Sequence, residues 1–175
     1  MRPRKKRRLW LFLALLLLLL LFGELYRSNF TIQAEAYSIS GAPAGFSGYR
    51  IVQLSDLHAR QLGKNHEKLL AAVAAQAPDL IVITGDLIDK DGQLPGLTPL
   101  LRGLRALAPV YYVTGNHEYS TSQLPELLAL MEQLDITPLC NSYVTLEQGG
   151  DSIILAGVED PNGRADMPTP EALLA

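Results

Sequence analysis

One long apolar run and three short ones set the pattern of hydrophobic positions along this chain. Residues 9–22 are apolar without interruption. Residues 50–54, 79–84 and 110–114 form short runs that are rich in branched or aromatic side chains and are each ended by polar residues. Short, bounded runs of this kind are typical of strands buried inside a sheet.

Helical patterns lie between and after the short runs. Residues 65–76 carry apolar side chains at helical spacing, residues 97–107 show the same pattern more weakly, and residues 124–134 place large apolar side chains on one face. Ser122 stands where an N-cap of the last helix is expected. The alternation of strand and helix predicts an α/β domain with a parallel sheet.

Two further strand regions are expected around this alternation. Residues 30–39 alternate loosely ahead of a glycine-rich loop, which predicts an opening strand. Residues 143–147 and 152–157 flank the sequence Gln-Gly-Gly-Asp, which predicts a β-hairpin. Residues 171–175 resemble the opening of a helix. We therefore expect the domain, residues 30–175, to be the N-terminal part of a longer one.

The long apolar run is expected to be a membrane anchor over residues 9–26. As a helix, residues 9–22 cover ~21 Å of the roughly 30 Å of hydrocarbon, and four more residues with one charge make a span feasible. Trp10 and Tyr26 suit the two interfaces. A signal peptide has the same layout, but no clear small-residue cleavage site follows the run. The pair Arg7-Arg8 resembles a twin-arginine signal only weakly.

The distribution of charge predicts the orientation of the anchor. Six of the 15 Lys and Arg residues lie within residues 1–8, which leaves nine against 18 acidic residues in the rest of the chain. Because positive charge stays in the cytoplasm, we expect a single-pass protein of the cytoplasmic membrane with an extracytoplasmic domain. The acidic body argues against nucleic acid as the main partner. Cys140, the single cysteine, is expected to be buried.

Each of the three central strands ends in residues that can bind a metal ion. The sequences are Ser-Asp-Leu-His at 55–58, Gly-Asp-Leu-Ile-Asp at 85–89 and Gly-Asn-His-Glu at 115–118. Open α/β sheets bind ligands at the carboxyl ends of their strands, so these side chains are expected to meet. In extended backbone, Asp56 and His58 would leave on one face and hold a single ion.

The other two segments extend this candidate metal site. Asp86 could add a carboxylate to the same ion or bridge to a second, while Asn116 offers an amide oxygen and His117 an imidazole. Oxygen and nitrogen ligands without thiolate suit manganese, iron or zinc. Each segment alone has an ordinary explanation as a turn or cap. Their order and even spacing, 30 residues from Asp56 to Asp86 and 30 more to Asn116, favour the metal site.

The three segments resemble the signature of the calcineurin-like metallophosphoesterase superfamily, and the wording Gly-Asn-His-Glu-Tyr is similar to its membrane-associated bacterial branch. The resemblance implies a layered sheet sandwich flanked by helices and a site for two divalent metal ions. It implies that Asp56 and His58 bind the first ion, that Asp86 bridges both, and that Asn116 binds the second. His117 would contact the phosphate or protonate the leaving oxygen.

The sequence also departs from the family's pattern. The family completes both metal shells with later Gly-His and Gly-His-x-His segments, whereas the other histidine here, His66, falls in a predicted helix and is expected at the surface. A membrane-tethered scaffold protein without catalysis therefore stays open as an alternative. The two acids Glu159 and Asp160 could edge the site or simply belong to a turn that ends the last strand.

The resemblance also narrows the class of substrate to be expected. The family's protein phosphatases carry an Arg-Gly pair after the second motif, whereas Lys90-Asp91-Gly92 follows Asp89 here, which argues against a phosphoprotein substrate. A phosphomonoester, a phosphodiester or a lipid-linked pyrophosphate is expected instead, the last because of the membrane anchor. That step is an analogy with the family rather than a property of these residues.

Overall fold

A computed structural model of the protein describes residues 3–161, 168–169 and 172–173. The chain divides into two compact units, residues 1–37 and 38–175, which are described separately. Of the helix opening expected at residues 171–175, only residues 172 and 173 fall within the described part of the chain, and both are helical.

The first unit is dominated by one helix, α1 (Pro3–Phe30), which extends beyond the predicted anchor at both ends. Within it, residues 6–27 are long and apolar enough to cross a membrane, with a mean hydropathy of 2.4. The strand predicted at residues 30–39 is wrong, because Phe30 is the last residue of α1 and residues 31–40 are neither helix nor strand. Loose alternation did not suffice, since a strand also needs a neighbour that accepts and donates its backbone hydrogen bonds.

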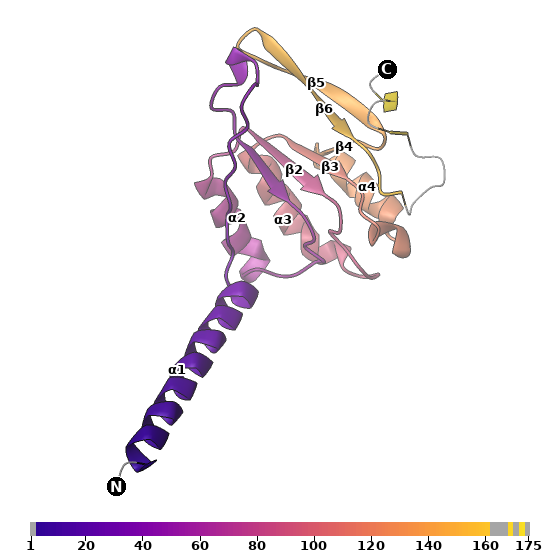
Figure 1. The fold of residues 1–175 in the computed structure, drawn as a ribbon. Helices are drawn as coiled ribbons and strands as arrows, with labels where there is room; N and C mark the ends of the chain where they lie inside the picture. Colours follow the sequence, from indigo (N-terminus) through magenta and orange to yellow (C-terminus); the bar gives the residue numbers. More distant parts are fainter. Residues whose placement is uncertain (1–2, 162–167, 170–171, 174–175) are drawn as a thin grey trace. The chain divides into compact units, whose positions relative to one another are not determined.

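The second unit is built on a parallel sheet with the order β1-β2-β3-β4, drawn in Figure 1. The three predicted strands are confirmed, and a short fourth one follows the last helix. The bounds are β1 (Ile51–Leu54), β2 (Leu80–Thr84), β3 (Val110–Val113) and β4 (Thr137–Pro138). The register aligns Leu54 with Ile83, and Ile83 with Tyr112, so the carboxyl ends of these strands lie side by side.

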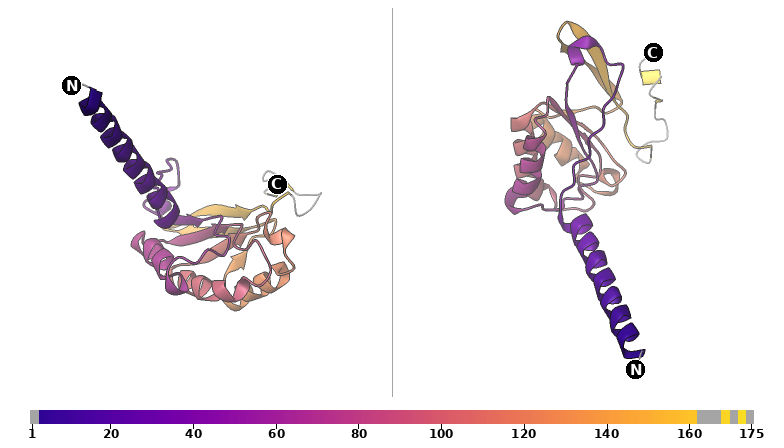
Figure 2. Two further views of the ribbon diagram at one scale, coloured as in Figure 1. Left: turned by 90° about the horizontal axis from the view of Figure 1, so that it is seen from below. Right: turned by 60° about the vertical axis from the view of Figure 1, so that its left-hand side comes forward.

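Three helices cover one face of the parallel sheet, as both views in Figure 2 show. They are α2 (Glu67–Ala75), α3 (Leu94–Leu107) and α4 (Leu124–Gln133). Buried side chains of the helices pack against those of the strands in a single core. Members from each layer are Val73, Leu101 and Met131 on the helices and Ile83 and Tyr112 on the strands.

The helix starts differ in detail from the prediction. Helix α3 begins at Leu94, three residues early, because Pro95 suits the first turn of a helix. Helix α4 begins at the predicted residue, but Ser122 is not its cap: Gln123 holds that place and makes no capping hydrogen bond with its side chain. Instead, the backbone N–H of Ser122 donates to Asp91 Oδ1 at 2.9 Å.

The predicted hairpin is confirmed as β5 (Ser142–Gln148) and β6 (Asp151–Gly157), an antiparallel pair. Gly149 and Gly150 form the turn with φ of 59° and 86°, values that glycine adopts without steric cost. Asp151 accepts a hydrogen bond from the backbone N–H of Gly45 at 2.7 Å, which ties the hairpin to the short helix η1 (Ala44–Phe46). Cys140 precedes the hairpin and is half-buried rather than fully buried.

Candidate metal centre

Three of the predicted site residues meet at the carboxyl end of the parallel sheet. His58, Asp86 and His117 follow β1, β2 and β3 in turn, and one ligand atom from each lies within 4.8 Å of the other two. The rings of His58 and His117 stand edge to face, with centroids 4.8 Å apart and an interplanar angle of 82°. All three residues are half-buried, so the cluster remains open to a ligand.

The loop after β1 reaches the cluster by a turn and not by extended backbone, as the sequence argument had assumed. Asp56 and His58 have φ of 54° and 46°, in the left-handed region. The backbone N–H of His58 donates to the carbonyl oxygen of Asp86 at 2.8 Å, and that of Ala59 donates to Leu87 at 2.6 Å. The loop after β1 is thereby held along the loop after β2.

Asp86 is the point at which the three loops join. Its carbonyl oxygen accepts from His58, and its carboxylate Oδ1 accepts from the backbone N–H of His117 at 3.1 Å. A Cβ atom on Gly115 would lie 2.2 Å from this same Oδ1, so only glycine fits there. These contacts orient the Asp86 carboxylate within the cluster.

Asp56, another predicted ligand, lies outside this cluster, and Asn116, the last predicted ligand, directly precedes His117 in the sequence. Both residues are exposed. The carboxylate of Asp56 accepts a hydrogen bond from Ser55 Oγ at 2.5 Å, and the carbonyl oxygen of Asn116 accepts from Ser120 Oγ at 3.2 Å. They flank the cluster on the first and third loops.

Glu118 is the residue of this region whose role the sequence argument missed. It opens the short helix η3 (Glu118–Ser120) and is completely buried. Its carboxylate accepts four backbone N–H groups, from Asp86, Leu87 and Ile88 after β2 and from Gly115 after β3. Its position directly after His117 in a run of polar residues was the available signal.

A second buried carboxylate, Glu159, joins the end of β6 to the same region. It accepts from the hydroxyl of Tyr119 at 2.8 Å and from Asn141 Nδ2 at 2.7 Å. Glu159 therefore anchors a turn and does not belong to the metal-binding cluster. Burial raises the pKa of the Tyr119 hydroxyl, and the bond to Glu159 raises it further, whereas a bond with Thr114 acts in the opposite direction.

His66, expected at the surface, is buried with a relative exposure of 2%. Asn65 and His66 both have positive φ, of 53° and 62°, and form the end of the short helix η2 (Lys64–His66), directly before α2. This bend turns the ring inward, where its Nε2 lies 3.0 Å from the carbonyl oxygen of Gly96 in α3. The residue contributes to packing and is no member of the cluster.

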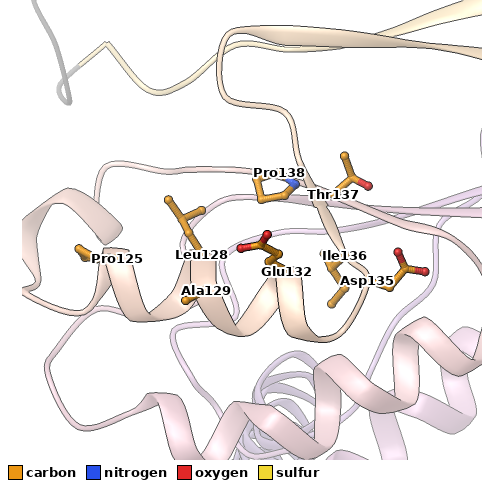
Figure 3. Close-up of a pocket in the computed structure, with 8 residues that line it drawn as sticks. All are labelled: Pro125, Leu128, Ala129, Glu132, Asp135, Ile136, Thr137 and Pro138. Carbon is orange, nitrogen blue, oxygen red and sulfur yellow. The ribbon is translucent and has the colours of Figure 1, made fainter.

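The donor set of the cluster fits a divalent metal ion. Two imidazoles and one carboxylate are the ligand types that zinc, manganese and iron share in proteins. His58 Nδ1 is buried and has no hydrogen-bond partner among the described residues, as expected of a nitrogen reserved for another ligand. The groove of Figure 3, about 630 Å³ in volume, lies between α4 and β4 and includes none of these residues.

Comparisons with known proteins agree with this picture. The sequence model of the family described as calcineurin-like phosphoesterase matches residues 49–173. The chain is 36% identical over 128 residues to a bovine transmembrane protein with metallophosphoesterase domain, a match that covers 67% of the chain and 29% of that protein. It is 32% identical over 143 residues to the uncharacterized metallophosphoesterase YkuE of Bacillus subtilis, which covers 77% of the chain and 50% of YkuE.

A solved structure also resembles the chain. Phosphopantetheinyl hydrolase from Mycobacterium tuberculosis aligns with a TM-score of 0.45 and 18% identity, over 62% of this chain and 41% of that one. The relatives come from animals as well as bacteria, including zebrafish. The chain spans half or less of the length of the bovine, zebrafish and Bacillus relatives.

Proposed function

The chain belongs to the calcineurin-like phosphoesterase family, and we propose that it forms part of a metal-dependent hydrolase of phosphate esters. The observation that carries the proposal is the cluster of His58, Asp86 and His117 at the carboxyl end of the sheet. The family match explains why two imidazoles and a carboxylate should converge there. The scaffold alternative gives no reason for this convergence.

Residues of the three loops divide the work in this proposal. His58 and Asp86 would hold an ion, and the hydrogen bond from the backbone N–H of His117 to Asp86 Oδ1 fixes the orientation of the carboxylate. A divalent ion bound there would supply Lewis acidity toward the phosphate and toward the attacking water. In this proposal the His117 imidazole, whose ring lies beside that of His58, would bind a phosphate oxygen or deliver a proton to the leaving oxygen.

We further propose that two ions act together. Asp56 and Asn116 flank the cluster on the first and third loops, and their oxygens would serve the additional coordination that a second ion requires. Manganese, iron and zinc all suit such a mixed set. Metal analysis of the purified chain tests this part. Two metal equivalents in the parent that fall to fewer in an Asp56→Asn, Asn116→Ala double variant would support it. One equivalent in the parent that the double variant leaves unchanged would exclude it.

The substrate in this proposal is an ester presented close to a membrane. Helix α1 contains a stretch that is long and apolar enough to span one, and basic residues precede it. By the positive-inside rule, residues 1–8 would face the cytoplasm and the metal centre would lie on the other side of the cytoplasmic membrane. A lipid-linked pyrophosphate or another phosphate ester near the headgroups would then be the natural class of substrate.

Hydrolysis of p-nitrophenyl phosphate and bis-p-nitrophenyl phosphate with added manganese tests the proposal. The assay compares the protein expressed from its full-length gene with its Asp86→Asn variant and with Glu126→Gln, an exposed acidic residue of α4. We expect turnover that Asp86→Asn lowers by at least 10²-fold, a size typical of losing one element of electrostatic stabilisation. Glu126→Gln should leave the rate unchanged.

The comparison of the two esters assigns the class of bond, since a monoesterase and a diesterase differ in which one they cleave faster. Turnover that survives Asp86→Asn would refute the proposed centre. Absence of turnover by metal-loaded parent protein on both esters, and on a lipid-linked pyrophosphate, would favour the scaffold alternative.

A further inference from the structure

Glu118 concentrates an unusual number of backbone contacts on one buried carboxylate. Its side chain has a relative exposure of 0%. Oxygen Oε2 accepts from Asp86 N at 2.9 Å and Gly115 N at 2.8 Å. Oxygen Oε1 accepts from Leu87 N at 2.6 Å and Ile88 N at 3.2 Å. All four donors belong to the two loops that follow β2 and β3.

Burying a carboxylate has a large desolvation cost, which only close hydrogen bonds offset. The four backbone donors supply them here. An apolar side chain of similar volume would fill the space without that cost, but it would leave four N–H groups unpaired, two of them in buried hydrogen bonds here. The arrangement therefore depends on both oxygens being acceptors.

The carboxylate fixes the separation of the two loops. Because Oε2 binds Asp86 N and Gly115 N together, these two nitrogens are held around one atom. Asp86 carries a ligand of the cluster, and Gly115 precedes the segment that carries His117. The same bonds stabilise the left-handed backbone of Asp86, at φ of 54°, a conformation that is uncommon outside glycine, although aspartate adopts it more often than most residues.

We infer that Glu118 is a positioning residue, which fixes the backbone of Asp86 against the loop that carries His117 before a metal ion arrives and so determines metal affinity through the Asp86 carboxylate. This inference rests on the proposed metal centre but not on the reaction that the centre carries out. Glu118 touches neither ion nor substrate, and it acts through the backbone of the residues that do.

The substitution Glu118→Gln isolates this role, because it preserves volume and removes one acceptor. In either orientation of the amide, its NH₂ group takes the place of an oxygen that accepts from two backbone N–H groups. Two hydrogen bonds are therefore lost, and the amide N–H donors face the backbone N–H donors. Glu126→Gln on the exposed face of α4 is the matched control. Both variants lose one negative charge.

Two measurements on the full chain in detergent micelles test the inference. Titration with Co²⁺, followed by its visible absorption below the unfolding temperature of each variant, measures metal affinity. We expect Glu118→Gln to bind about 10- to 100-fold more weakly than the parent, the range found for residues that orient metal ligands, and Glu126→Gln to bind as the parent does. Amide hydrogen exchange in EDTA then measures the loops without metal.

In the metal-free parent we expect the amides of Asp86, Leu87, Ile88 and Gly115 to be protected from exchange, and in Glu118→Gln to exchange faster. If Glu118→Gln binds cobalt as tightly as the parent, the inference is overturned while the metal centre stands. If that variant does not fold, exchange in the parent decides, because unprotected amides at these four positions would overturn it and protected ones would support it. A parent that binds no cobalt would overturn the proposed centre and this inference together.

Discussion

The close approach of the loops after β2 and β3 makes Gly85 a sharp test of the site's architecture. Gly85 has φ of 84°, and a Cβ atom there would lie 2.5 Å from Gly115 N and 2.6 Å from Gly115 Cα. Gly92 has nearly the same φ, 85°, but nothing lies within 4 Å of its Cβ position. The pair Gly85→Ala and Gly92→Ala thus separates steric contact from backbone strain.

The expected magnitudes follow from this difference. Both alanines carry the left-handed strain of about 1–2 kcal/mol, partly offset by about 0.4–1 kcal/mol from the less flexible unfolded chain. Gly85→Ala must also separate the two loops, which adds about 1–3 kcal/mol for overpacking and weakens the bonds to Glu118. We therefore expect Gly85→Ala to be less stable than Gly92→Ala by at least about 2 kcal/mol.

Urea unfolding of the full chain in detergent micelles measures the difference. Near-UV circular dichroism of the tyrosines is the appropriate signal, because α1 adds a far-UV helix signal that micelles preserve. With unchanged m-values, the shift in midpoint converts directly into a difference in free energy of unfolding. Equal midpoints for Gly85→Ala and Gly92→Ala would refute the close approach of these loops.

Three further substitutions probe the surrounding structure. The buried Tyr112 hydroxyl has no hydrogen-bond partner among the described residues, and burial raises its pKa, so the folded state keeps the proton that the unfolded chain loses near pH 10. The free energy of unfolding should therefore fall as pH rises above about 10, by up to ~1.4 kcal/mol per pH unit. Tyr112→Phe should flatten that fall when unfolding by urea is measured at a series of pH values. Leu101→Ala should cost about 2–5 kcal/mol of unfolding free energy, because the side chain is fully buried, whereas Leu107→Ala in the same helix, at 38% exposure, should cost far less. Tyr119→Phe removes a donor to the buried Glu159 and should lower the thermal midpoint by an amount equivalent to about 1.5–3 kcal/mol, and an unchanged midpoint would show that this bond contributes nothing.

Local sequence patterns predicted most of the second unit because its three main parallel strands are short apolar runs ended by polar residues and its hairpin turns on glycines. The runs that became β1, β2 and β3 needed no long-range information, since short apolar runs ended by polar residues have few other uses in a soluble domain. Residues 31–40 show the opposite case. A loosely alternating segment becomes a strand only beside another strand, and its own sequence cannot reveal whether one is present.

The candidate site was predictable in position but not in conformation. The strand ends predicted that His58, Asp86 and His117 would lie close together, as the structure shows, because the carboxyl ends of parallel strands share one edge of a sheet. The period of two between Asp56 and His58 suggested extended backbone, whereas both residues adopt positive φ. Hydrogen bonds to the neighbouring loop, such as that from His58 N to Asp86 O, select this conformation, and such partners are distant in sequence.

Glu118 and His66 show why the polarity of a side chain is a poor predictor of its solvent exposure near such loops. Both lie in polar stretches and both are buried, at 0% and 2% exposure. Loops that leave the ends of strands carry backbone N–H and C=O groups that no strand neighbour satisfies, and burial of those groups requires partners. A carboxylate satisfies four such N–H groups at Glu118, and an imidazole lies against a helix carbonyl oxygen at His66. A polar side chain is buried here because unpaired backbone groups require a hydrogen-bond partner. The sequence does not show which groups are unpaired, because distant loops come together only in the folded structure.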